Sequence, residues 1–75
     1  MTDLTPAGLR AARAILQWKL IDLERESGVA FSTIHAIEAG KRAPQSKTAE
    51  ALISAFAAHG VELLPPPQAG ARLRA

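Results

Sequence analysis

The sequence predicts a compact all-α domain built from four short helices. Alanine and leucine are abundant, runs of β-branched residues are absent, and apolar residues recur at spacings of three and four, as helices with one buried face require. A chain of 75 residues forms one domain with a modest core, and a hydrophobic content of 48% is ordinary for a soluble globular protein. We therefore expect a single core between helices.

The first helix is expected over residues 6–16. Thr5 precedes Pro6, and this order is typical of an N-cap followed by proline at the first helical position. An apolar stripe follows at helical spacing, formed by Leu9, Ala12 and Leu16.

Two further short helices are expected over residues 19–27 and 31–39. Gly28 ends the first of them, and the core-facing positions of the pair are Leu20, Leu23, Ile34 and Ile37. Only Gly28, Val29 and Ala30 separate the two helices, so they cannot lie antiparallel and must cross at a steep angle. Such a pair is a helix-turn-helix.

The fourth helix is expected over residues 46–59, with Ser46 as its cap and Gly60 as its terminator. Its apolar stripe consists of Ala49, Leu52, Ile53 and Phe56. We expect Trp18 in the same core, and His59 as a residue of the helix end rather than a ligand.

Three consecutive prolines at positions 65–67 cannot be helical. They divide the chain into a domain over residues 1–64 and a tail over residues 65–75. The flanks of the prolines form either a short β-hairpin or part of an extended tail, and these flanks are residues 61–64 and 71–74.

The sequence supplies no catalytic or metal site. Cysteine is absent, which excludes disulfides and thiolate zinc sites. His35 and His59 lie far apart in the chain, and the acidic cluster at positions 22, 24 and 26 does not converge on one helix face. We expect no enzyme activity, metal or cofactor. A run of about 18 apolar residues and a signal peptide are also absent, which predicts a cytoplasmic protein without a membrane partner.

In a helix-turn-helix the second helix of the pair enters the major groove of DNA, which is about 12 Å wide and admits one helix. The side chains left on or near the outer face of residues 31–39, and expected to contact bases, are Phe31, Ser32, Thr33, His35 and Ala36. No Arg, Asn or Gln is among them, so site choice would depend on DNA shape, thymine methyl groups and dimer spacing. Two alternatives remain open: Phe31 as a core aromatic, and His35 as a phosphate donor or a merely exposed residue.

Positive charge is concentrated after the third helix, although the net charge is only +2. Lys41, Arg42 and Lys47 lie close together with no acidic residue among them. Alone, such a cluster is consistent with a solvated loop. Beside a groove-binding helix it predicts a patch that contacts phosphates.

A specific motif runs through residues 28–44, with its defining positions at Gly28, Val29, Ile34, Ile37, Glu38, Gly40, Lys41 and Pro44. The motif resembles that of the lambda-repressor-like family, the Cro/XRE type of helix-turn-helix, and the similarity extends from Leu9 to Val61. The resemblance implies an ion pair between Arg13 and Glu38, the alternative being two solvated charges.

The resemblance also implies phosphate contacts from Lys41 and Arg42, which Lys47 would join. The chain departs from the family at Lys19 and Leu20, where a capping Ser or Thr and a phosphate-binding Gln are usual. The lost cap costs about 1 kcal/mol, and Lys19 offers a positive charge to the phosphate instead. Ala30 likewise replaces a capping residue, so the third helix begins at Phe31 or one residue later.

The function implied by the resemblance is that of a DNA-binding transcriptional regulator. We expect a repressor that binds double-stranded DNA at an inverted repeat as a homodimer, through residues 31–39. The fourth helix with residues 61–64 is the expected dimer contact, and residues 71–75 would add a strand to it. Two alternatives are the antitoxin of a toxin–antitoxin pair, whose partner is a toxin, and a protein-interaction module that has lost DNA binding.

Overall fold

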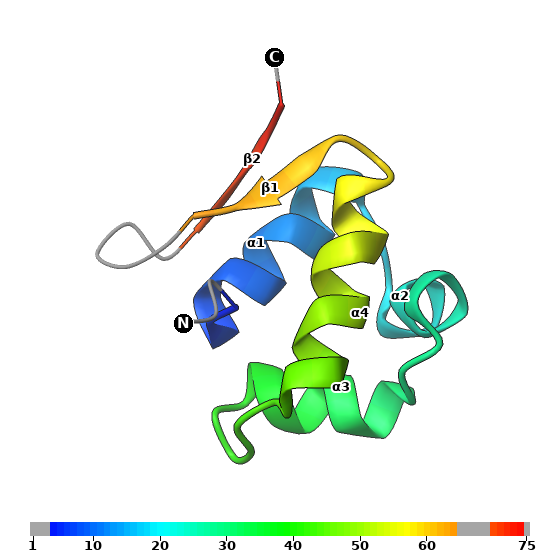
Figure 1. Ribbon diagram of the computed structural model, residues 1–75, viewed down its shortest axis with the longest axis vertical. Helices are drawn as coiled ribbons and strands as arrows, with labels where there is room; N and C mark the ends of the chain where they lie inside the picture. The colour runs from blue at the N-terminus through cyan, green and yellow to red at the C-terminus, as the bar shows by residue number, and fades with distance from the viewer. Residues whose placement is uncertain (1–3, 65–69, 75) are drawn as a thin grey trace.

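The computed structural model describes residues 4–64 and 70–74 and shows four helices and a small hairpin around one core (Figure 1). The elements are α1 (Pro6–Leu16), α2 (Leu20–Ser27), α3 (Phe31–Glu38), α4 (Ser46–Ala57), β1 (Val61–Leu63) and β2 (Ala71–Leu73). The predicted four-helix class is confirmed, and the C-terminal flanks form the hairpin rather than an extended tail. The prolines and the last residue of the predicted tail lie outside the described residues.

Helix α1 has the predicted bounds. The Thr5 hydroxyl caps it by accepting a hydrogen bond from the Gly8 backbone N–H at 2.9 Å. The helix ends at Gln17, which adopts a left-handed conformation with φ 57°. This conformation lets the Trp18 N–H donate to the Arg13 carbonyl at 2.9 Å, closing the last turn. A side chain at such a φ is strained, which glycine would avoid.

Helix α2 begins one residue later than predicted, because Lys19 occupies the N-cap position. The Lys19 side chain contains no hydrogen-bond acceptor and cannot cap the helix. The Asp22 carboxylate instead accepts a hydrogen bond from the Lys19 backbone N–H at 2.8 Å. This is the half of a capping box that the third helical residue supplies. Gly28 ends α2 with φ 78°.

Helix α3 begins at Phe31, with Ala30 as an N-cap that makes no side-chain bond, and ends one residue before the predicted Ala39. The prediction that Ser46 caps α4 is wrong, since Gln45 holds that position and Ser46 is the first helical residue. Helix α4 ends at Ala57, short of the predicted position 59.

The hairpin pairs β1 with β2 in antiparallel register, Glu62 lying opposite Arg72. It packs on α1, and β1 also contacts α4. Gly8 permits this close approach, because a Cβ at position 8 would lie 3.2 Å from the Gly70 carbonyl oxygen. The residue before β2 therefore lies close to the α1 backbone.

Every helix contributes to the core, and β1 completes it. The largest fully buried side chains are Leu9, Leu23, Ile34, Ile37, Leu52, Phe56 and Val61. Trp18 is half-buried at the margin, so the expected core position holds only in part. Its ring stacks on Phe56 at 5.8 Å between centroids and meets the edge of His59 at 4.8 Å. His59 Nε2 lies 3.0 Å from Glu26 Oε1, which links the end of α4 to α2.

Helix α3 and the hairpin occupy opposite ends of the molecule (Figure 1). The loop after α3 lies at the same end as α3, whereas β2 leads to the C-terminus at the far end. The predicted base-contacting helix and the C-terminal strands are therefore separate surfaces.

Candidate nucleic-acid interface

Helix α3 offers one solvent-exposed face beside a fully buried one. Ile34 and Ile37 are buried, and Phe31 is 52% exposed. The alternative that placed Phe31 in the core is therefore wrong. Ser32 and His35 are exposed as well, whereas Thr33 and Ala36 are half-buried.

Helical geometry separates the five predicted base-contacting residues. At about 100° per residue, Phe31, Ser32 and His35 fall within about 100° of arc on the outer face. Thr33 lies about 160° from Phe31, next to the buried Ile37, and is therefore the member of the set farthest from the outer face. Ala39, exposed directly after α3, joins the outer face one turn beyond His35. Sequence reasoning missed Ala39, although its spacing of four from His35 indicated it.

The end of α3 is held to α1 by an ion pair. Arg13 Nε and Nη2 donate to Glu38 Oε2 and Oε1 at 2.6 and 2.9 Å. Arg13 Nη1 also donates to the Trp18 carbonyl oxygen at 2.8 Å. The hydrogen bond to Glu38, together with the charge of that carboxylate, raises the pKa of Arg13 further above its ordinary value, against the opposing effect of partial burial. The guanidinium thus remains charged.

A second arginine, Arg10, contacts the same end of α3. Arg10 Nη1 donates to the Glu38 backbone carbonyl at 2.5 Å. A positive charge at this position satisfies one of the unpaired carbonyls of α3 and opposes the negative end of its dipole. Sequence reasoning missed this contact, although Arg10 and Arg13 lie three residues apart and hence on one face of α1.

The basic loop, residues 39–45, connects α3 to α4 and contains Lys41 and Arg42. Gly40, with φ 74°, turns the chain, and the Lys41 N–H donates back to the Ala36 carbonyl at 3.0 Å. This closure places Lys41 and Arg42 beside the C-terminal end of α3, and both are exposed. Lys47 is exposed in the first turn of α4, and Lys19 is exposed at the start of α2. Among residues 4–64 and 70–74, none of these four forms an ion pair.

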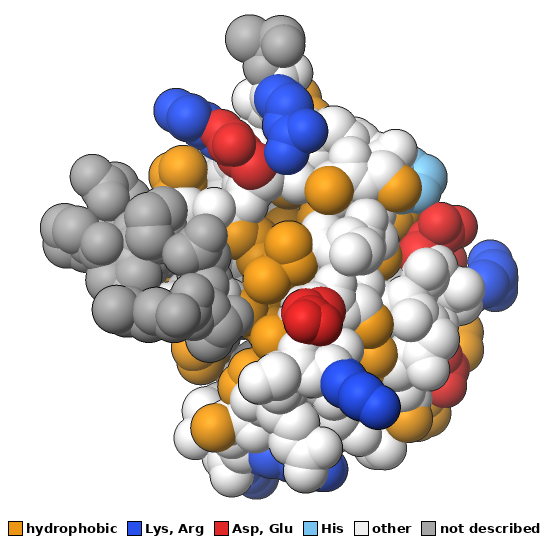
Figure 2. All heavy atoms as spheres, viewed as in Figure 1, with side chains coloured by type: hydrophobic (Ala, Val, Ile, Leu, Met, Phe, Trp, Pro, Cys, Tyr) orange, Lys and Arg blue, Asp and Glu red, His pale blue; other side chains and the backbone are white. Residues whose placement is uncertain are grey.

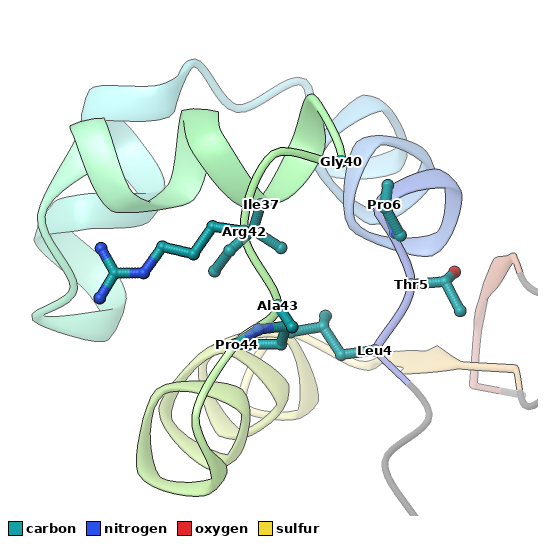
Figure 3. Close-up of a pocket in the computed structure, with 8 residues that line it drawn as sticks. All are labelled: Leu4, Thr5, Pro6, Ile37, Gly40, Arg42, Ala43 and Pro44. Carbon is teal, nitrogen blue, oxygen red and sulfur yellow. The ribbon is translucent and has the colours of Figure 1, made fainter.

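A largely apolar hollow of about 400 Å³ lies behind the basic loop (Figure 3). It is lined by Leu4, Thr5, Pro6, Ile37, Gly40, Arg42, Ala43 and Pro44. Figure 3 shows the Arg42 guanidinium pointing away from Thr5 and Pro6, so the charged end stays outside the hollow. Leu4 is buried and belongs to the core. The N-terminal segment and the loop therefore face each other across this hollow, with the charged end of Arg42 on its outer side.

Neither a metal site nor a membrane-spanning helix is found among the described residues. No group of three His, Asp or Glu side chains within them could hold a metal ion. No described helix has both the length and the apolar character needed to cross a membrane.

Comparison with known proteins identifies the region that carries this surface. A family model described as helix-turn-helix matches residues 9–63, which span most of α1, the three other helices and β1. No curated protein matches the chain. The matched region contains Arg13, Glu38 and the basic loop.

Proposed function

The chain belongs to the lambda-repressor-like, Cro/XRE-type helix-turn-helix family of DNA-binding regulators, and from this premise we propose that it is a transcriptional repressor. It binds double-stranded DNA at an inverted repeat as a homodimer. One observation carries the proposal: α3 exposes a full face at one end of the molecule, and its C-terminal end adjoins basic residues that form no ion pair within the part of the chain that the structure describes.

In the proposed complex α3 lies in the major groove, with Phe31, Ser32 and His35 toward the base edges. Thr33 and Ala36 reach the groove walls from the flank of the helix. Phosphates on either side of the groove are contacted by Lys19, Lys41, Arg42 and Lys47. These contacts position the protein without selecting a sequence. Arg13 and Glu38 act only by holding α3 at a fixed angle to α1.

We place the dimer contact on α4 and the segment after it. Ile53 and Leu64 are half-buried apolar residues, and Figure 2 shows apolar side chains gathered where α1, α4 and β1 meet. A second copy seated there would bury this apolar area and double the DNA contact. We do not extend the contact to the free edge of β2, because Arg72 and Arg74 would oppose the same residues of the second copy.

Selection from a pool of random duplexes tests the proposal. We expect enrichment of an inverted repeat whose half-sites lie about 10 base pairs, or a multiple of that, apart. Sedimentation of the protein at tens of micromolar, with and without the selected duplex, should show a dimer. A monomer in both conditions would contradict the dimer, and a pool that shows no enrichment would contradict sequence-specific binding.

One observation favours the interaction module as a second candidate. Ile21 and Phe31 are large apolar side chains at 48% and 52% exposure, on the two helices of the helix-turn-helix unit. A partner protein would bury both. The antitoxin alternative keeps DNA binding and adds a toxin at the C-terminal segment, and a toxin reading frame beside the gene would support it.

A further inference from the structure

The outer face of α3 carries one large apolar side chain, at the end of the helix where a DNA-binding helix meets bases. Phe31, the first residue of α3, is half exposed, and Ala30 and Ala39 are exposed just outside the two ends of the helix. The exposed polar side chains between them are Ser32 and His35. Glu38, the one carboxylate of the helix, is 8% exposed and is held by Arg13, so it does not face a ligand.

This composition limits what the face can recognise. Discrimination of guanine or adenine by paired hydrogen bonds requires Arg, Lys, Asn or Gln, and α3 has none of them. The one apolar group that a standard base pair presents in the major groove is the C5-methyl group of thymine. 5-Methylcytosine carries a methyl group on the same ring carbon. An exposed phenyl ring gains hydrophobic contact from such a group and nothing from a bare cytosine or uracil edge.

The position of the ring suits this contact. The N-terminal residues of a recognition helix are those that reach base edges. The first turn of α3 is fully formed, since the N–H groups of Thr33 and Ile34 donate to the Ala30 carbonyl at 3.0 and 3.1 Å. The Phe31 backbone is therefore fixed before DNA arrives, and little ordering is needed on binding.

We propose that Phe31 recognises the C5-methyl group of a pyrimidine in the major groove, so that the protein prefers DNA with thymine or 5-methylcytosine at the contacted position. This inference rests on the proposed DNA-binding function. It assigns site choice chiefly to apolar contact with methyl groups.

Replacement of thymine by uracil in the selected duplex tests the inference, because uracil keeps every hydrogen-bonding group and lacks only the methyl. Single replacements should weaken binding by about four-fold at one or two positions in each half-site. At a sensitive position, cytosine and 5-methylcytosine opposite guanine are then compared. We expect tighter binding of 5-methylcytosine, and equal binding of the two cytosines overturns the part of the inference that concerns 5-methylcytosine.

Two variants identify the residue responsible. Phe31→Ala should bring the ratio of thymine to uracil affinity close to one, while Ile21→Ala, a matched loss of an exposed apolar side chain on α2, should leave the ratio unchanged. Thermal unfolding monitors the fold of both variants. Equal affinity for thymine and uracil at every position, or an unchanged ratio in Phe31→Ala, overturns the inference and leaves DNA binding standing. Absence of binding to any duplex at low salt overturns the proposed function as well.

Discussion

Arg13 and Glu38 join α1 to the end of α3 through two parallel hydrogen bonds, from Nε and Nη2 to the two carboxylate oxygens. The third guanidinium nitrogen, Nη1, donates to the Trp18 carbonyl in the turn before α2. One side chain thereby ties together α1, the turn before α2 and the end of α3. Because the basic loop follows Glu38 within a few residues, the same contact fixes the place where the proposed phosphate contacts begin.

Removal of one partner should cost far more than removal of both. Arg13→Met leaves the Glu38 carboxylate with little solvent and without the two hydrogen bonds from Arg13, so we expect a loss of about 3 kcal/mol in the free energy of unfolding. The double variant with Glu38→Leu should lose less than Arg13→Met alone, because it leaves no carboxylate without its partner. Urea unfolding followed by Trp18 fluorescence measures all three.

Arg25→Met is the matched control for this pair. Arg25 is largely exposed, and its Nη1 lies 3.9 Å from Asp22 Oδ1. Its replacement should change stability by less than about 0.5 kcal/mol. Strictly additive costs for the Arg13 and Glu38 substitutions would show that the pair contributes no coupling.

The left-handed end of α1 should tolerate glycine better than its own residue. Gln17 has φ 57°, and Gln17→Gly removes the strain of a side chain in that conformation. We expect the free energy of unfolding to rise by about 0.5 kcal/mol. Gly28→Ala is the converse: nothing lies within 4 Å of the added Cβ, so its expected cost of about 1 kcal/mol comes from φ 78° alone. If chemical unfolding showed that both substitutions raise, or that both lower, the free energy of unfolding, this account would be refuted.

The basic loop should account for part of the salt dependence of DNA binding. Each of Lys41→Ala and Arg42→Ala should weaken binding to all duplexes and reduce the slope of log affinity against log salt by about 1, since each removes one phosphate contact. Fluorescence anisotropy over a range of salt concentrations measures the slope. Arg74→Ala removes the same charge at the far end of the molecule and should leave the slope unchanged. An unchanged slope in both loop variants would count against the loop as an anchor.

The free edge of β2 is protected from pairing with another copy. The Arg74 N–H and the Gly70 carbonyl oxygen form hydrogen bonds with the β1 side of the hairpin. The backbone N–H and C=O groups of Ala71 and Leu73 therefore point away from β1, toward solvent. An antiparallel two-fold register centred on Leu73 sets Arg74 opposite Arg72, and one centred on Arg72 sets two Arg72 side chains, each paired with its own Glu62, against each other. Arginine meets arginine in both registers, which opposes association. Leu73, at 61% exposure, would otherwise favour it.

Replacing both arginines should therefore release this edge. We expect Arg72→Thr/Arg74→Thr to form assemblies larger than those of the wild type in sedimentation at tens of micromolar, while Arg25→Thr sediments like the wild type. Identical sedimentation of the double variant and the wild type would show that the arginines do not protect the edge.

The sequence by itself determined the number and type of the helices and most of their ends. Thr5, Gly28 and Gly40 act on their immediate neighbours through capping and φ, and such signals are legible without the fold. The apolar spacing of Ile34 and Ile37 likewise identified the buried face of α3. Where a cap was weak, as at Ser46, the predicted cap was wrong by one residue, because several adjacent residues can begin a helix at similar cost.

Only the tertiary structure decided which surfaces of these helices contact one another and which face solvent. It placed Arg10 on the Glu38 carbonyl, left Phe31 in solvent, and set Trp18 between Phe56 and His59 at the margin of the core. It also selected the hairpin, which Gly8 admits against α1. These outcomes depend on contacts between residues far apart in the chain, and the geometry of such contacts is set by how whole helices pack rather than by local propensity.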